Sequence, residues 1–104
     1  MKLVSSSFAD GQPIPSDFSF CIPDSAHRVC LGKNLNPHLA WSDVPTGTKS
    51  FVLICHDPDV PSRGDDVNQE DRTVPATLPR VDFFHWVLID LPASLTEIQA
   101  GEFS

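Results

Sequence analysis

The stretch Ser-Phe-Val-Leu-Ile-Cys-His-Asp-Pro-Asp-Val-Pro, residues 50–61, carries the strongest structural signal in the chain. After the first serine, five consecutive residues are aromatic, β-branched or otherwise apolar, which is typical of a strand buried on both faces. The polar run that begins at His56 contains two prolines and is expected to end the strand. We therefore predict a central strand over residues 50–55, with Cys55 as a buried and unreactive thiol.

A second long strand is predicted over residues 81–91, Val-Asp-Phe-Phe-His-Trp-Val-Leu-Ile-Asp-Leu, with Pro92 closing it. Shorter strands are expected over residues 18–22, where apolar residues alternate with small ones, and over residues 39–41. The remaining segments are expected to be a loop over 23–37, an exposed acidic excursion over 64–80 and one or two helical turns over 94–100.

Composition agrees with this count of strands. The chain has 104 residues, enough for one domain, and its ten prolines are about twice the average usage. Proline removes a backbone donor and fixes φ, so prolines spread along a chain favour short strands and turns over long helices. We predict a mainly β fold with few short helices.

The net charge indicates which partners the protein disfavours, and the cysteine count indicates its cellular compartment. Seven basic against fourteen acidic side chains give a net charge of −7, which disfavours nucleic acid and anionic membrane surfaces. No stretch resembles a signal peptide or a membrane span, and three cysteines cannot all pair within one chain. We expect a cytoplasmic protein with reduced thiols and no stable membrane insertion.

Four motifs in a fixed order carry a family resemblance that spans nearly the whole chain. Their order and spacing resemble the phosphatidylethanolamine-binding protein family, in particular its bacterial Raf-kinase-inhibitor-like branch. The motifs are Asn34-x-x-Pro37-x-Leu39-x-Trp41, Pro45-x-Gly47-Thr48-Lys49-Ser50-Phe51, Asp57-Pro58-Asp59-Val60-Pro61 and Phe84-His85-Trp86-Val87-Leu88.

The resemblance implies an antiparallel β-sandwich built around a large central sheet, with a small anion pocket at one end. By motif position, Asp57 and His85 match residues that line this pocket, and Pro61 matches a pocket proline that is often cis. Asp59 matches a residue that shapes the loop. Pro58 and Trp86 are expected to support the residues that line the pocket without contacting the ligand, and Trp86 is assigned to packing.

One family block is missing from residues 1–104. The family's Gly-Pro-x-Pro-Pro stretch, with its following His-Arg-Tyr-like strand, supplies the opposite wall of the pocket, and no counterpart is found here. We therefore expect residues 1–104 to be the N-terminal part of a single domain that holds one wall of the pocket. A homodimer, or a second chain or fragment, would then complete the fold.

The chemistry of Asp57 and His85 suits a small ligand that carries both donors and acceptors. A histidine donates to an anion, whereas an ionised aspartate repels a dianion and attracts an amine or hydroxyl. This combination favours a phosphate ester or a zwitterionic head group such as phosphoethanolamine. The resemblance implies binding without catalysis or cofactor. It also implies a protein partner, because the family resemblance extends to regulation of a kinase or another enzyme by direct binding.

The rival interpretation is a metal-assisted hydrolase centred on Asp57 and His85. His56 and Asp59 would add ligands of the type that zinc or iron accepts, and a metal-bound water would supply the nucleophile. No H-x-H or H-E-x-x-H motif supports it, so we expect no metal site. Of the remaining groups, His56 is predicted to be a solvent-facing residue at a strand end.

Overall fold

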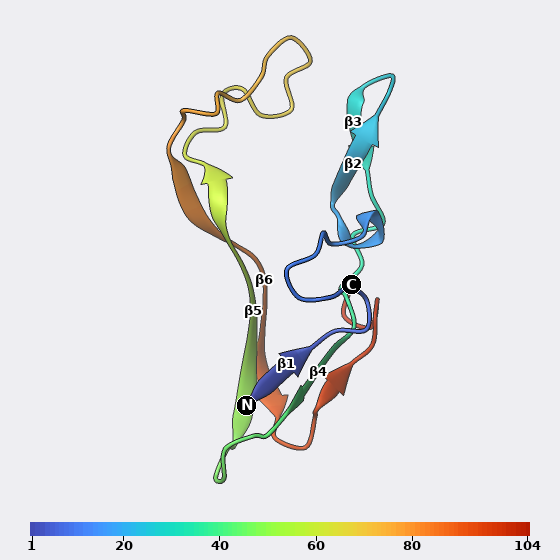
Figure 1. The fold of residues 1–104 in the computed structure, drawn as a ribbon, viewed down its shortest axis with the longest axis vertical. Coiled ribbons are helices and arrows are strands. Elements are labelled where there is room, and N and C mark those ends of the chain that lie inside the picture. Colours follow the sequence, from blue (N-terminus) through green and yellow to red (C-terminus); the bar gives the residue numbers. More distant parts are fainter. The chain divides into compact units, whose positions relative to one another are not determined.

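A computed structural model describes residues 1–104 and is mainly β, which confirms the predicted fold class (Figure 1). No helix in it is long and apolar enough to cross a membrane. The chain divides into two compact units, one of residues 1–49 with 92–104 and one of residues 50–91. The elements are β1 (Lys2–Val4), η1 (Ser16–Phe18, a 3₁₀ turn), β2 (Cys21–Asp24), β3 (Arg28–Leu31), β4 (Leu39–Ser42), β5 (Ser50–Pro61), β6 (Arg80–Pro92) and β7 (Glu97–Ile98).

The first unit contains a three-stranded antiparallel sheet in the order β1-β4-β7. Strand β4 is the predicted 39–41 strand and lies in the centre, with Leu3 opposite Trp41 and Leu39 opposite Ile98. Alternation along β4 places Trp41 and Ile98 on the same face of the sheet, and both are buried, at 6% and 0% exposure. Trp41 and Ile98 therefore belong to the small core of this unit.

The helical turns predicted for residues 94–100 are wrong. Strand β7 lies there instead, because the segment pairs with β4 and the Thr96 carbonyl accepts a hydrogen bond from the Trp41 N–H at 2.9 Å. Tertiary pairing therefore overrides the local preference of this short segment.

A β-hairpin in the first unit corrects two further predictions. The strand expected over 18–22 begins only at Cys21, after the 3₁₀ turn, and the loop expected over 23–37 contains all of β3. The Asp24 carboxylate accepts the backbone N–H groups of Ala26 and His27 at 3.1 and 2.8 Å, and this side-chain turn reverses the chain. The loop composition of this segment therefore marks a hairpin turn.

Gly32, at the foot of this hairpin, has no room for a side chain. A Cβ atom there would lie against the Ser19 carbonyl oxygen, far inside van der Waals contact, while the Gly32 N–H donates to Phe20 at 2.7 Å. We expect Gly32→Ala to lower the free energy of unfolding by about 1–3 kcal/mol through overpacking. Thermal denaturation measures it, with Gly64→Ala as the control because a Cβ at Gly64 meets open space. Equal effects of the two changes would contradict the clash.

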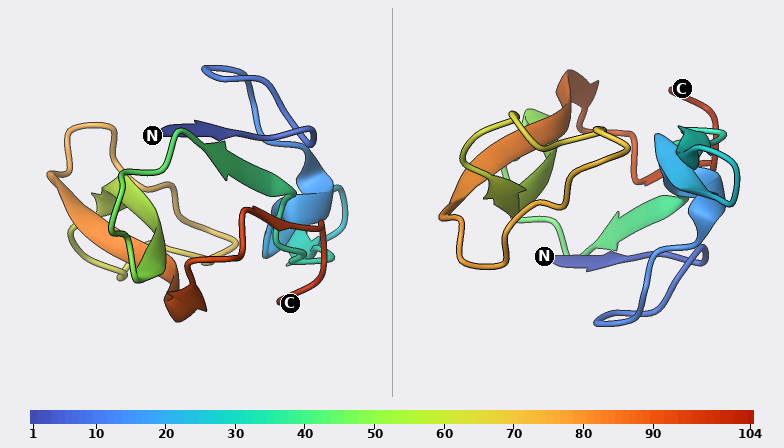
Figure 2. Two further views of the ribbon diagram at one scale, coloured as in Figure 1. Left: turned by 90° about the horizontal axis from the view of Figure 1, so that it is seen from below. Right: turned by 90° about the horizontal axis from the view of Figure 1, so that it is seen from above.

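The second unit is the two-stranded ladder of β5 and β6, which lie side by side in both views of Figure 2. The predicted 81–91 strand is confirmed as part of β6, but β5 continues past Cys55 to Pro61. Each strand has a free edge, so prolines lose no ladder bond where their nitrogens face outward. The central position predicted for β5 is wrong in this chain, because it pairs with β6 alone.

Exposure in the ladder is correspondingly high. Large apolar side chains remain exposed on it, with Val52 at 59% and Ile89 at 66%, and the buried thiol predicted at Cys55 is wrong because Cys55 is exposed. A 62–79 connection of turns joins the strands, closed by the Ser62 N–H donating to the Pro79 carbonyl at 2.9 Å. The assignment of 64–80 as an excursion within a single domain stays a prediction.

Candidate functional site: the Asp57–His85 pair

Asp57 on β5 and His85 on β6 are brought together, 28 residues apart in the sequence. The His85 Nε2 atom lies 3.0 Å from Asp57 Oδ2, and the side chains are 50% and 38% exposed. Solvent reaches both side chains, so a small ligand can approach the contact. The strands thus place together the two residues that the sequence singled out, although their role in binding stays a prediction.

The Asp57 carboxylate has a second partner within its own strand. Its Oδ1 atom accepts the Asp59 backbone N–H at 2.8 Å, across the intervening Pro58. The His85 side chain foremost, and then the Asp59 N–H, hold the pKa of Asp57 below its usual value of 3.8. Asp57 is therefore ionised throughout the physiological pH range and oriented by its own backbone.

His85 has one occupied and one open ring nitrogen. Because Asp57 is an acceptor only, the His85 Nε2–H donates to it and Nδ1 makes no hydrogen bond within the chain. The ring of Phe83 packs edge-on against the imidazole, with 4.9 Å between centroids. The open Nδ1 can accept from a ligand donor when the ring is neutral, or donate to an oxyanion when it is protonated.

A second histidine–carboxylate pair lies on the opposite face of the same ladder. His56 Nε2 is 2.9 Å from Asp82 Oδ1, and the His56 ring stacks on Phe84 at 5.2 Å. Side chains alternate along a strand, so residues 56, 82 and 84 share one face, and 57, 83 and 85 share the other. His56 faces solvent, as predicted, but its predicted position at a strand end is wrong, since it lies within β5. The sequence signal for this second pair, which sequence reasoning missed, is the alternation itself: His56 precedes Asp57 in β5, and Asp82 and Phe84 alternate with Phe83 and His85 in β6.

The other predicted site residues make no polar contact with the pair through their side chains. They are Pro58, which lies between Asp57 and Asp59 in β5, Pro61 and Trp86. Pro61 is the last residue of β5, and no peptide bond in the chain is cis, so the cis geometry expected at Pro61 is wrong here. Trp86 is half-buried and follows His85, which places it on the opposite face of β6. No hydrogen bond or ring contact joins Pro61 or Trp86 to the Asp57–His85 pair, and their supporting roles stay predictions.

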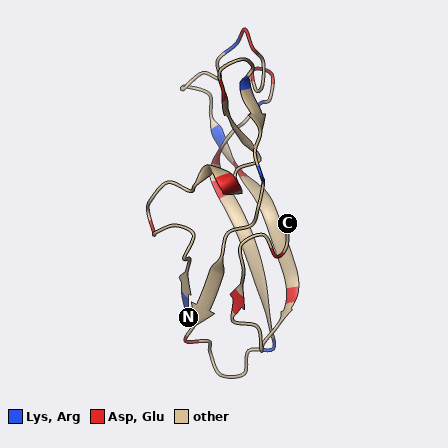
Figure 3. Ribbon diagram, turned by 90° about the vertical axis from the view of Figure 1, so that its right-hand side faces the viewer, with Lys and Arg blue, Asp and Glu red and all other residues tan.

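The ligand set proposed for a metal does not converge. No group of three or more His, Cys, Asp or Glu side chains is arranged to hold a metal ion. His56, which the hydrolase interpretation needs beside Asp57, is paired with Asp82 on the other face. The four residues of the hydrolase interpretation therefore do not gather on one face of the ladder. Lys and Arg positions are scattered along the chain in both units (Figure 3).

Comparison with known proteins identifies the class to which this fold and site belong. The family described as phosphatidylethanolamine-binding protein matches residues 4–103, so the chain belongs to that family. Within the family it falls in the UPF0098 branch, which confirms the branch indicated by the motifs. UPF0098 protein YbhB of Escherichia coli is 36% identical over 107 residues, and a UPF0098 protein of Aquifex aeolicus is 36% identical over 98.

A solved structure supports the same fold. A crystal structure of a phosphatidylethanolamine-binding protein homologue from Chlamydia trachomatis superposes with a TM-score of 0.64 at 30% identity and covers 95% of this chain. The chain spans 50% of that structure, 50% of YbhB and 41% of the Aquifex protein. It therefore corresponds to about half the length of these relatives.

Proposed function

We propose that the Asp57–His85 pair is one wall of a binding site for a small phosphate ester or zwitterionic head group, and that the site binds without catalysis. The observation that carries the proposal is the 3.0 Å contact between two half-exposed side chains from different strands, one of them ionised. Family membership supports it, because the family to which the chain belongs is named for binding phosphatidylethanolamine.

The charges of the pair favour a ligand with two kinds of group. The Asp57 carboxylate attracts an ammonium or hydroxyl donor, and His85 presents its open Nδ1 beside it. A phosphoethanolamine-like molecule offers both an ammonium and an oxyanion within a few bonds. A bare polyanion offers only the second, so the ionised Asp57 disfavours it.

The test is a titration of the 104-residue chain with glycerophosphoethanolamine, followed by NMR or by tryptophan fluorescence. His85→Ala should weaken binding at least about tenfold, because a hydrogen bond to a charged group contributes roughly 1.5–3 kcal/mol. His56→Ala is the matched control, since it removes an equivalent histidine–carboxylate contact from the opposite face of the same strands. Equal losses in both variants, or an unchanged affinity in His85→Ala, would show that the pair is not the site.

The hydrolase interpretation is tested on the same purified sample by elemental analysis. The binding proposal expects no stoichiometric zinc or iron. One equivalent of either metal that His85→Ala abolishes would replace the binding proposal with the metal-centred one.

A further inference from the structure

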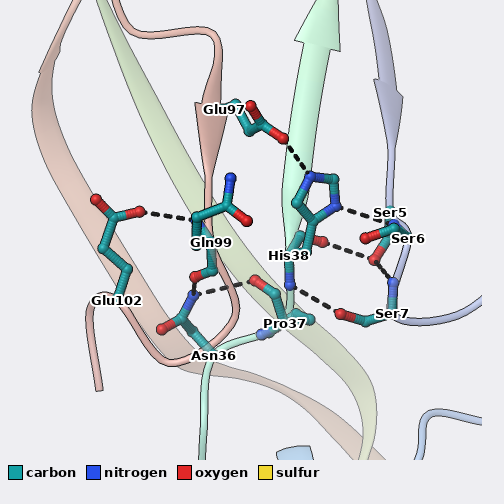
Figure 4. A network of polar contacts seen from close by, with 9 residues as sticks. All are labelled: Ser5, Ser6, Ser7, Asn36, Pro37, His38, Glu97, Gln99 and Glu102. Atoms are coloured by element: carbon teal, nitrogen blue, oxygen red, sulfur yellow. Dashed lines mark hydrogen bonds and ion pairs between the residues drawn. The ribbon is translucent and has the colours of Figure 1, made fainter.

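His38, immediately before β4, makes hydrogen bonds from both ring nitrogens to segments far away in the sequence. Its Nδ1 accepts the Ser6 backbone N–H at 2.9 Å, and its Nε2 lies 2.7 Å from Glu97 Oε1. Figure 4 shows the ring between the segment of residues 5–7 on one side and Glu97 of β7 on the other. The side chain is only 13% exposed, so these partners replace solvent.

These partners fix the proton on the ring. A backbone N–H can only donate, so the His38 Nδ1 facing Ser6 must carry a lone pair. The proton of the neutral ring is then on Nε2, where it donates to Glu97. The His38 hydrogen bond, followed by that of Gln99, holds the pKa of Glu97 below its usual value of 4.5, so the acceptor is ionised.

The backbone of His38 is also tied to residues 5–7. The Ser5 hydroxyl donates to the His38 carbonyl at 2.6 Å, and the His38 N–H donates to the Ser7 hydroxyl oxygen at 2.9 Å. Strand β1 precedes this segment, has three residues that are all exposed, and pairs with β4 alone. Residues 5–7 are therefore held by the contacts made at His38, and residues 2–4 by their three register pairs with β4.

We propose that His38 is a proton-sensitive latch that holds β1 and residues 5–7 on the edge of β4. A doubly protonated imidazole has only donors, so protonation of Nδ1 and the hydrogen bond from Ser6 exclude each other. A proton on Nδ1 therefore breaks this bond and places two N–H groups face to face.

The same proton strengthens the other side of the latch. The charged ring keeps its Nε2 contact with ionised Glu97 as an ion pair, so β7 stays on β4. Residues 5–7 bring no charged group to the ring. Lys2 pairs with Asp43 at the far end of the ladder, and the Glu102 carboxylate accepts the Gln99 N–H. Release is therefore confined to β1, and it leaves the edge of β4 open for pairing with another strand.

Amide hydrogen exchange of the full 104-residue chain, resolved by NMR at pH 7.5 and 5.5, tests the latch. Protection factors, which remove the intrinsic pH dependence of exchange, should fall about tenfold for Ser6 and the β1 amides, equivalent to roughly 1.4 kcal/mol. Amides between β4 and β7 should keep their protection. Unchanged protection of residues 2–7, or an equal fall across β4 and β7, would overturn the proposal.

Two variants separate a titrating latch from a merely structural contact. His38→Asn carries an oxygen on Cγ, where Nδ1 is attached, so it can accept from Ser6 but cannot gain a proton; the pH step should disappear. Glu97→Gln keeps an acceptor for Nε2 but removes the ion pair, so release should move to lower pH. A step that persists in His38→Asn, or stays in place in Glu97→Gln, would overturn the latch. These readouts concern the first unit and do not depend on the Asp57–His85 site.

Discussion

Asn36→Ala should lower the free energy of unfolding by about 4 kcal/mol, because four hydrogen bonds of roughly 1 kcal/mol each are lost from a buried side chain. The Asn36 side chain is 7% exposed and its hydrogen-bonding capacity is fully used. Its amide nitrogen donates to the Pro37 and Gln99 carbonyls, and its oxygen accepts from the Phe103 N–H and the Ser104 hydroxyl, all at 2.9–3.0 Å. Alanine leaves buried carbonyl and N–H groups without partners, and their desolvation makes the loss large.

Urea denaturation followed by tryptophan fluorescence measures this change. Gln12→Ala is the control, because it removes an exposed amide and should change stability by less than about 0.5 kcal/mol. Asn36→Asp keeps both acceptor contacts but sets a carboxylate against two carbonyls, so it should be at least as damaging as alanine. If Asn36→Ala changed stability no more than the control, the four hydrogen bonds of Asn36 would contribute little to stability.

Asn36 and His38 also show where sequence reasoning reached its limit. Apart from the neighbouring Pro37 carbonyl, their partners lie 59 to 68 residues away towards the C-terminus, and for His38 also near the N-terminus. No local period or spacing marks such contacts. The strands over residues 39–41 and 81–91 could be predicted because burial and alternation leave a pattern within each strand. The β2–β3 hairpin was missed because Pro23 and Asp24 are residues that loops and hairpin turns share.

The candidate site divides in the same way. The motif resemblance placed Asp57 and His85 in one pocket, and the structure brings the two side chains within 3.0 Å of each other, while their role in binding stays a prediction. The opposing His56–Asp82 pair was missed because β5 was expected to end at Cys55, which removed His56 from the alternation. Once β5 is extended to Pro61, the two pairs follow from the two-residue period of the strands. The length of β5 was therefore what sequence reasoning needed in order to find the second pair.

Proton uptake should accompany the binding of an oxyanion at the Asp57–His85 pair. The His85 Nε2–H already donates to Asp57, so the neutral ring has no donor left for a phosphate oxygen. A proton on Nδ1 supplies that donor, and the neighbouring ionised carboxylate balances its charge. Asp57 does not titrate with it, since its lowered pKa keeps it charged well below neutrality. Its contribution to stability is present above its ordinary pKa of 3.8 and is lost only as the pH falls through the lowered value.

The affinity for glycerophosphoethanolamine, measured between pH 8 and 6, should therefore rise as the pH falls, because a proton is taken up on binding. A phosphodiester is the right probe because it has no second phosphate proton to titrate in this range. Calorimetry in buffers of different ionisation enthalpy measures both the affinity and the protons taken up. His85→Gln is the control: its amide can still donate to Asp57 but does not titrate, so its affinity should be low and independent of pH. An affinity that rises with pH, or a slope that survives in His85→Gln, would mean that the ligand meets neutral His85 as an acceptor and that its donor groups provide the main contact.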